Sequence, residues 1–128
     1  MGDFVHLHLH TEYSLLDGAA KISEIAAKAQ ADGQRAVAIT DHGAMYGVVE
    51  FYDEMKKNGI KPIIGCEVYV ASRSRFLKDG KADSSGNHLI LLCKNEVGYK
   101  NLIDLVSKGF TEGFYSKPRV DLDLLRTH

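Results

Sequence analysis

The sequence has little of several features that define common classes of protein. No apolar run approaches the roughly 20 residues of a membrane span. The opening Met1-Gly2-Asp3 is not followed by the basic and apolar segments of a signal peptide. We therefore expect a cytoplasmic protein with no membrane partner. The only two cysteines, Cys66 and Cys93, lie in apolar runs, which predicts buried, reduced thiols and agrees with a reducing compartment.

An excess of charge of either sign is also missing. Sixteen Lys and Arg residues oppose 17 Asp and Glu residues, which leaves a formal net charge of -1. A surface that gripped duplex DNA alone would carry a basic excess. Any contact with nucleic acid is thus expected to be local or to involve residues outside this chain. Nucleophilic catalysis is disfavoured, because neither cysteine has an obvious base beside it and no Gly-x-Ser-x-Gly or phosphate-loop pattern occurs.

Strand-like and helical segments alternate along the chain, which predicts an α/β fold with a parallel sheet. Strands are expected at 4–10, 36–40, 63–70 and 88–93, and helices at 23–32, 46–58 and 96–108, with a further helix opening at 122. The polar stretch 72–87 reads as an exposed excursion or a hairpin. Ser23 and Asn95 are candidate helix caps, and Gly33 and Gly59 fit helix stops. The inward helical positions are predicted to be Val48, Tyr52, Met55, Val97, Leu102, Ile103 and Val106.

Four strands and three helices are about half of a closed (β/α) barrel, which typically needs roughly 250 residues. We therefore expect residues 1–128 to be one truncated domain. An open parallel edge would be a liability, so the isolated fragment is expected to self-associate or exchange elements.

Histidine is the most unevenly distributed residue type, because three of six histidines fall within five residues. Residues i and i+2 of a strand share a face, so His8 and His10 can meet one metal ion. The alternative is a solvated edge strand with chance histidines. His6 shares the face but lies a pleat further in, and is predicted to be a packed, hydrogen-bonded core residue, with metal binding as the other option.

Polar residues also mark the ends of the following strands, where α/β folds place their sites. His42 follows a buried run, and Asp41 is a candidate to hold its second nitrogen, or else a cap or turn residue. Glu67 interrupts an apolar strand, so its carboxylate needs a cation or an arginine partner. Asp17 is a further oxygen donor, or a turn residue before Gly18. His88 stands at the start of its run and not at the end, so either the strand begins earlier or the preceding loop folds over the site.

Mixed imidazole and carboxylate ligands suit zinc, manganese or iron and disfavour calcium. Several such ligands on one face indicate two or three metal ions a few ångströms apart. That arrangement supports hydrolysis of phosphoesters by a metal-activated water. These residues therefore predict a metal-dependent phosphoesterase.

Four stretches in this order and spacing resemble the polymerase-and-histidinol-phosphatase (PHP) domain: HLHLHTEYSLLDGA, AVAITDHGAMYGVVEFY, GIKPIIGCEVYV and HLILLCKNEVGYKNL. More narrowly, they resemble the version at the amino terminus of the bacterial DNA polymerase III alpha subunit. The resemblance covers nearly the whole chain. It implies a distorted seven-stranded barrel with a trinuclear site whose metal ligands include His8, His10, Asp17, His42, Glu67 and His88. Glu67 would bridge two ions.

The resemblance also implies a function for the larger protein. Ligand-complete members are expected to act as 3′→5′ exonucleases on the 3′ end of a primer strand, alongside DNA-directed DNA synthesis within a polymerase holoenzyme. We expect Glu67 and Asp41 to contribute to catalysis. Later family motifs and the polymerase domains lie beyond residue 128, so the isolated fragment is expected to have an incomplete metal site and little activity. Two alternatives are a histidinol-phosphatase-like enzyme acting on small molecules and a non-catalytic module that braces the polymerase.

Overall fold

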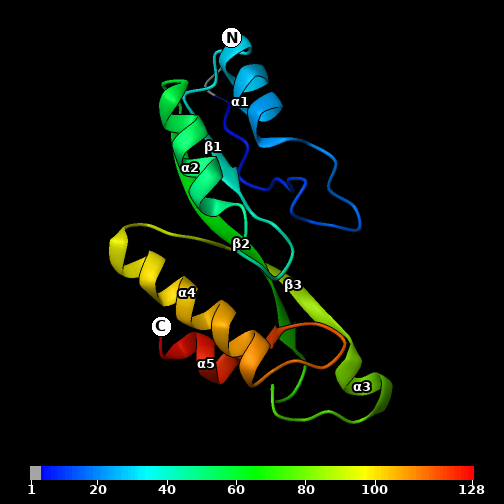
Figure 1. Cartoon of the computed structure of the whole chain (residues 1–128). Coiled ribbons are helices and arrows are strands. Elements are labelled where there is room, and N and C mark those ends of the chain that lie inside the picture. Colours follow the sequence, from blue (N-terminus) through cyan, green and yellow to red (C-terminus); the bar gives the residue numbers. More distant parts are fainter. Residues whose placement is uncertain (1–3) are drawn as a thin grey trace.

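A computed structural model describes residues 4–128 as a mixed α/β fold around one sheet (Figure 1). The long strand β2 (Lys61–Ala71) is the centre of this sheet and pairs with every other strand in the described part. Strands β1 (Ala36–Ile39) and β4 (Arg119–Val120) run parallel to the first and second halves of β2. Strand β3 (Gly86–Leu92) runs antiparallel to β2.

The prediction of a wholly parallel sheet is wrong, because β3 returns beside β2 in the opposite direction. The polar stretch between them forms the excursion of a long hairpin, which contains the short helix α3 (Gly80–Ser84). In an antiparallel pair, the start of one strand lies beside the end of the other. His88, near the beginning of β3, therefore lies beside the last residues of β2.

The alternating histidine segment, predicted to be a strand over 4–10, is not a regular strand in the structure. His6 forms an isolated parallel bridge with Val37, and the Ala38 amide donates to the His6 carbonyl at 2.8 Å. Further along, the Leu9 amide donates to the hydroxyl of Thr40 at 2.8 Å. Because this side chain takes the place of a backbone acceptor, the regular ladder is interrupted, although the segment still lies beside β1.

The longer helices follow the predicted positions closely. They are α1 (Ile22–Ala31), α2 (Val48–Lys57) and α4 (Glu96–Thr111), and the short α5 (Leu122–Arg126) follows β4. Gly33 and Gly59 have φ values of 69° and 70°, which suits glycine at a helix stop. Asn95 caps α4 through a 3.0 Å bond from the Gly98 amide. Ser23 is not a cap, because α1 begins one residue earlier, after Lys21.

Two apolar clusters hold the elements together. The first lies where α1 and α2 cover β1, and the second where α4 and α5 cover β2 and β4. The predicted inward positions Val48, Met55 and Leu102 are buried, and Val106 packs against the second cluster. The positions Tyr52, Val97 and Ile103 are instead exposed, and Phe51 and Leu105 are buried in their vicinity. The buried stripes of α2 and α4 thus differ in part from the predicted ones, each by a shift of about one residue.

A buried arginine network fastens the hairpin excursion to β4. The guanidinium of Arg119 is fully buried and donates to four backbone carbonyls, those of Gly113 (2.9 Å), Asp83 (2.7 Å), Arg75 (3.0 Å) and Leu77 (2.8 Å). Each contact satisfies a carbonyl that the polar excursion or its neighbours would otherwise bury unpaired. This arginine was not singled out from the sequence, where Pro118-Arg119 reads as an ordinary tail.

Within residues 4–128, no helix has the length and apolar character that crossing a membrane requires.

Replacing Arg119 with methionine should destabilise the protein. The variant removes the donors of four backbone carbonyls, two of them in buried bonds, and we expect the free energy of unfolding to fall by about 3 kcal/mol. Urea unfolding followed by circular dichroism measures this loss. Arg126→Met is the matched control, because Arg126 is exposed and its ion pair with Asp123 spans 3.4 Å; its effect should stay within about 0.5 kcal/mol. Equal effects of the two substitutions would contradict the role of the network.

The two cysteines should differ in reactivity. Burial raises the pKa of the Cys66 thiol to about 12, so at pH 8 Cys66 is both protonated and shielded. Cys93 is only half-buried, although burial raises its pKa as well. A disulfide reagent at pH 8 should modify Cys93 first and Cys66 only after unfolding, as peptide mass mapping can show. Rapid labelling of Cys66 in the folded protein would be inconsistent with the structure.

Candidate metal centre

Glu67 lies in the middle of β2 and points away from the helices. Its neighbours Cys66 and Val68 belong to the apolar cluster beneath α4, and side chains alternate along a strand. Glu67 and Tyr69 therefore share the opposite face. The Glu67 side chain is only 3% exposed. The predicted alternative, an arginine partner, is not found among the described residues, and the groups closest to this carboxylate are imidazoles.

The segment after β1 continues beside β2 and brings His42 level with Glu67. The Glu67 amide donates to the Asp41 carbonyl at 3.0 Å, and the Gly43 amide donates to the Glu67 carbonyl at 2.8 Å. Gly43 then turns with a φ of 60°. A Cβ at this position would lie 2.9 Å from both Tyr69 and Pro118. Glycine is therefore required here by backbone conformation and by close packing.

Three imidazoles surround the two oxygens of Glu67. His8 Nε2 lies 3.0 Å from Oε1, and His42 Nδ1 and His88 Nδ1 lie 2.5 Å and 3.1 Å from Oε2. His88 reaches this carboxylate because it pairs with Tyr69 in the antiparallel ladder, one diagonal position from Glu67. The antiparallel direction of β3 thus places His88 at the site without a loop folding over it.

The remaining predicted ligands join the same cluster. His10 Nε2 lies 3.1 Å from His8 Nε2, and the His10 ring stacks on His42 with centroids 4.0 Å apart. Asp17 Oδ2 lies 2.8 Å from His42 Nε2. The structure therefore brings together the whole predicted set, which comprises His8, His10, Asp17, His42, Glu67 and His88.

The donor atoms of this cluster have the arrangement of a metal centre. Two groups of three residues, one with His8 and His10 and one with His42 and His88, each include Glu67, and within each group the donor atoms lie within 4.8 Å of one another. His10 Nδ1, His42 Nδ1 and Glu67 Oε2 are buried without a hydrogen-bond partner. The short His42–Glu67 contact is not aligned as a hydrogen bond. Buried nitrogen and oxygen atoms without a hydrogen-bond partner are the atoms that a shared cation would satisfy.

The titration of two neighbouring groups fits this environment. Burial lowers the pKa of His10, and the adjacent His42 imidazole lowers it further, which favours the neutral form that binds metals. Burial raises the pKa of Tyr69, and the nearby Glu67 carboxylate adds to this effect. Tyr69 therefore stays a neutral phenol beside the imidazoles.

Asp41 does not support an imidazole, contrary to one of its two predicted roles. Its fully buried carboxylate accepts bonds from the Thr11 amide (2.6 Å), the Thr11 hydroxyl (2.8 Å) and the Ser14 hydroxyl (2.7 Å). The Ser14 carbonyl in turn accepts from the amides of Asp17 and Gly18 at 3.1 Å and 2.7 Å. Asp41 thus holds the turn that presents Asp17 from outside that turn, a role that neither prediction described.

The prediction for His6 is also wrong, because this side chain is exposed and lies edge-on to Phe4 with ring centroids 4.7 Å apart. The sequence analysis missed Thr11, Ser14 and Tyr69. Tyr69 could have been found, since it lies two residues after Glu67 on the same strand face. Thr11 and Ser14 carry no comparable signal, because their importance depends on Asp41, which is distant in the chain.

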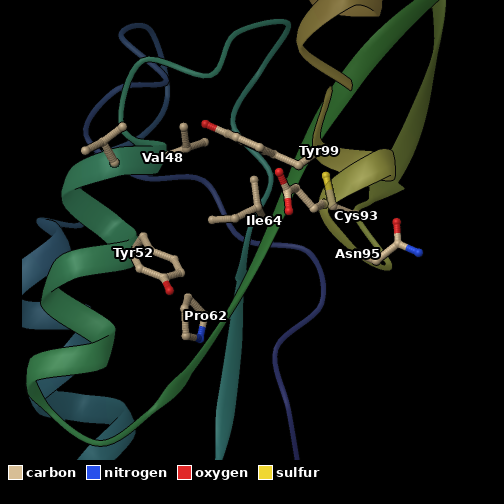
Figure 2. A pocket seen from close by; sticks show the side chains of 9 residues that line it. Val48, Tyr52, Pro62, Ile64, Cys93, Asn95 and Tyr99 are labelled. Carbon is tan, nitrogen blue, oxygen red and sulfur yellow. The ribbon is translucent and has the colours of Figure 1, made fainter. Parts of the chain in front are cut away.

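Two cavities flank β2 on opposite sides. One, of about 470 Å³, adjoins the imidazoles and is lined in part by Asp17, His42 and His88. The other, of about 370 Å³, lies between α2 and α4 and is largely apolar. Figure 2 shows Val48 and Tyr52 of α2 facing Ile64 and Pro62 of β2 in this second cavity, with Cys93, Asn95 and Tyr99 beyond them. None of the predicted site residues lines the apolar cavity, so the predicted site adjoins the first cavity.

The chain is similar to known proteins in sequence and in fold. The family model of the PHP domain matches residues 6–128. The DNA polymerase III alpha subunits of Borreliella burgdorferi, Chlamydia pneumoniae and Aquifex aeolicus are 56%, 53% and 48% identical to this chain over 98% of its length. The chain spans only 10% to 11% of the length of these relatives.

A solved structure of an amidohydrolase from Chromobacterium violaceum has a similar fold. It superposes with a TM-score of 0.53 at 23% identity and covers 81% of this chain and 34% of its own. At that level of identity the likeness concerns the fold alone. Together with the match of the family model over nearly every residue, the sequence and the structure lead to one conclusion: the chain belongs to the PHP domain family.

Proposed function

We propose that this chain is the amino-terminal PHP part of a bacterial replicative DNA polymerase subunit. Its imidazole–carboxylate centre would hydrolyse the phosphodiester at the 3′ end of a DNA strand. The single observation that carries the hydrolytic part is the sharing of one buried carboxylate, Glu67, by two groups of metal-binding donors. A carboxylate shared in this way suits a bridge between two divalent ions, of which zinc or manganese fit the donor set.

Within this proposal, each residue has a distinct task. His8, His10, Asp17, His42, Glu67 and His88 would hold the metal ions, and Asp41 would hold the turn that presents Asp17. When bound, such ions lower the pKa of a coordinated water and polarise a phosphoryl oxygen. Glu67 is buried in β2 and cannot move far. Its two oxygens would therefore hold the two histidine groups at fixed positions relative to each other. Burial and the adjacent His42 lower the pKa of His10, which favours the neutral ring that can act as a ligand.

The polymerase part of the proposal is supported by the named relatives, which are all DNA polymerase III alpha subunits. In this role the protein would act in the bacterial cytoplasm, on the 3′ end of a primer strand and with other holoenzyme subunits. The described sheet would form the first part of a distorted seven-stranded barrel. We also propose that residues 1–128 alone are a weak enzyme, because the family resemblance assigns further ligands to later motifs.

A pair of neighbouring histidines provides the sharpest test of the proposed function. His8 lies against Glu67 in the metal centre, whereas His6 is exposed and lies outside the metal centre. In the protein at its full natural length, His8→Asn should reduce bound metal and 3′→5′ exonuclease turnover, the latter by at least about 100-fold, because a direct ligand matters at least as much as its supporting groups. His6→Asn should leave both unchanged. Elemental analysis and release of a 3′-terminal label measure the two quantities.

The same assay separates the competing functions. A protein that cleaves histidinol phosphate but not a DNA 3′ end would be a small-molecule phosphatase. If His8→Asn lost metal and destabilised the polymerase while the parent showed no hydrolysis of either substrate, the domain would be a brace. Either result would refute the proposed exonuclease.

Asp41 and Asp17 should respond differently to loss of charge. Asp41→Asn disturbs three buried bonds from Thr11 and Ser14, so we expect it to lower the free energy of unfolding by about 1–3 kcal/mol and to weaken metal binding. Asp17 is exposed, so Asp17→Asn should weaken metal binding with little loss of stability. Thermal unfolding of the metal-free proteins, combined with metal titration, distinguishes the two. Equal stability of both variants would mean that Asp41 does not hold the turn.

A further inference from the structure

The cavity beside the metal centre has a chemically mixed lining. It includes Asp17, His42 and His88 together with residues that the metal centre does not use. Its volume of about 470 Å³ falls in the range of sites for small organic ligands and exceeds what a phosphate ion needs. The unassigned residues of this lining therefore bear on which substrate the centre takes.

Lys117 is the one lysine that lines this cavity in the described part of the chain, and no arginine lines it there. Its Nζ lies 4.6 Å from the centroid of the Tyr69 ring. That ring lies beside His88 and His42, with centroids 5.0 Å and 6.1 Å away. Within residues 4–128, no carboxylate forms an ion pair with Lys117. Its charge is thus available to an anion close to the imidazoles.

The backbone that carries Lys117 is held in place. Ser116 has a φ of 61°, and the Tyr115 amide donates to the Lys117 carbonyl at 3.0 Å across this tight turn. The next residue, Pro118, packs so closely against Gly43 that a side chain at position 43 would collide with it. Among residues 4–128, Ser116 is the one non-glycine residue with a positive φ, a conformation that is unfavourable for a residue with a side chain. This strained turn sets the direction of Lys117.

Aromatic and apolar residues also line the cavity. Among them are Tyr46 and Phe110, whose ring centroids lie 6.5 Å apart. Leu15 and Leu16 project from the turn held by Asp41 and are almost fully exposed. Exposed rings beside a cationic group are the features with which proteins bind a base and its phosphate without reading sequence.

We propose that this cavity binds the terminal nucleotide of the substrate, with the Lys117 ammonium on the phosphate and the Tyr46–Phe110 wall against the base and sugar. This inference rests on the proposed phosphoesterase function and adds the nucleotide subsite to it. Lys117 is a binding residue here, since its ammonium group reaches the same open space as the metal-binding side chains. A small phosphoester without a base would leave the aromatic wall unused.

The first experiment isolates Lys117. Binding of thymidine 5′-monophosphate and of inorganic phosphate is measured by titration calorimetry in the full-length protein, with metal content determined for each variant. Lys117→Met should weaken both probes roughly tenfold, as expected for loss of a charged partner, with metal content unchanged. Lys117→Arg should restore most of the affinity. Lys57→Met is the matched control, because Lys57 is exposed on α2 and pairs with Glu54.

The second experiment isolates the aromatic wall. Tyr46→Ala should weaken thymidine 5′-monophosphate roughly fivefold or more, as the loss of one stacking contact predicts, and should leave inorganic phosphate unaffected. Tyr52→Ala is the control, since Tyr52 lies on α2 and lines the other cavity. If Tyr46→Ala changed neither probe, the occupant would be a small phosphoester and the nucleotide assignment would fail.

The outcomes separate this inference from the proposed function. Equal affinity of Lys117→Met and the parent for both probes would overturn the assignment of Lys117, and so would absence of saturable binding to the parent. Binding that depends on Lys117 and Tyr46 in a protein without exonuclease turnover would support the nucleotide subsite while contradicting the proposed hydrolysis.

Discussion

The structure depends on one buried carboxylate in the middle of its longest strand. A negative charge that is 97% removed from solvent is costly unless cationic or strongly polar groups meet it. In this protein the neighbouring groups are three imidazoles from three separate segments, at 2.5–3.1 Å from Glu67. A shared metal ion would relieve the remaining unpaired lone pairs. The convergence of these segments is therefore tied to the burial of a single side chain.

The sheet provides this convergence by pairing β2 with a different partner along each part of its length. The segment after β1 places His42 beside Glu67, and the antiparallel β3 places His88 one diagonal position away. The opposite face of β2 remains apolar and packs on α4. One strand thus separates a polar site from an apolar core, because its side chains alternate. The Arg119 network fastens the long excursion between β2 and β3, and so supports the strand that carries His88.

The two buried acidic residues Glu67 and Asp41 have opposite physical roles. Glu67 has free lone pairs and imidazole neighbours, whereas Asp41 is satisfied by three donors from Thr11 and Ser14. Burial alone does not separate their roles, since both are buried. What distinguishes them is whether the hydrogen-bonding capacity is used within the chain or left facing a common point.

The sequence by itself determined most of the elements and the residues that gather around Glu67. Glycine stops, an asparagine cap and alternating apolar residues are local signals, so the helices and the central strands could be located, and the residue types of the site pointed to metal chemistry. Only the tertiary structure decided the direction of β3, the loss of regular pairing around His6, the turn-holding role of Asp41 and the buried position of Arg119. These features depend on partners far apart in the chain, such as Thr40 for Leu9 and Asp83 for Arg119. Local sequence patterns do not predict such partners, because burial and hydrogen bonding are decided only when distant segments pack together.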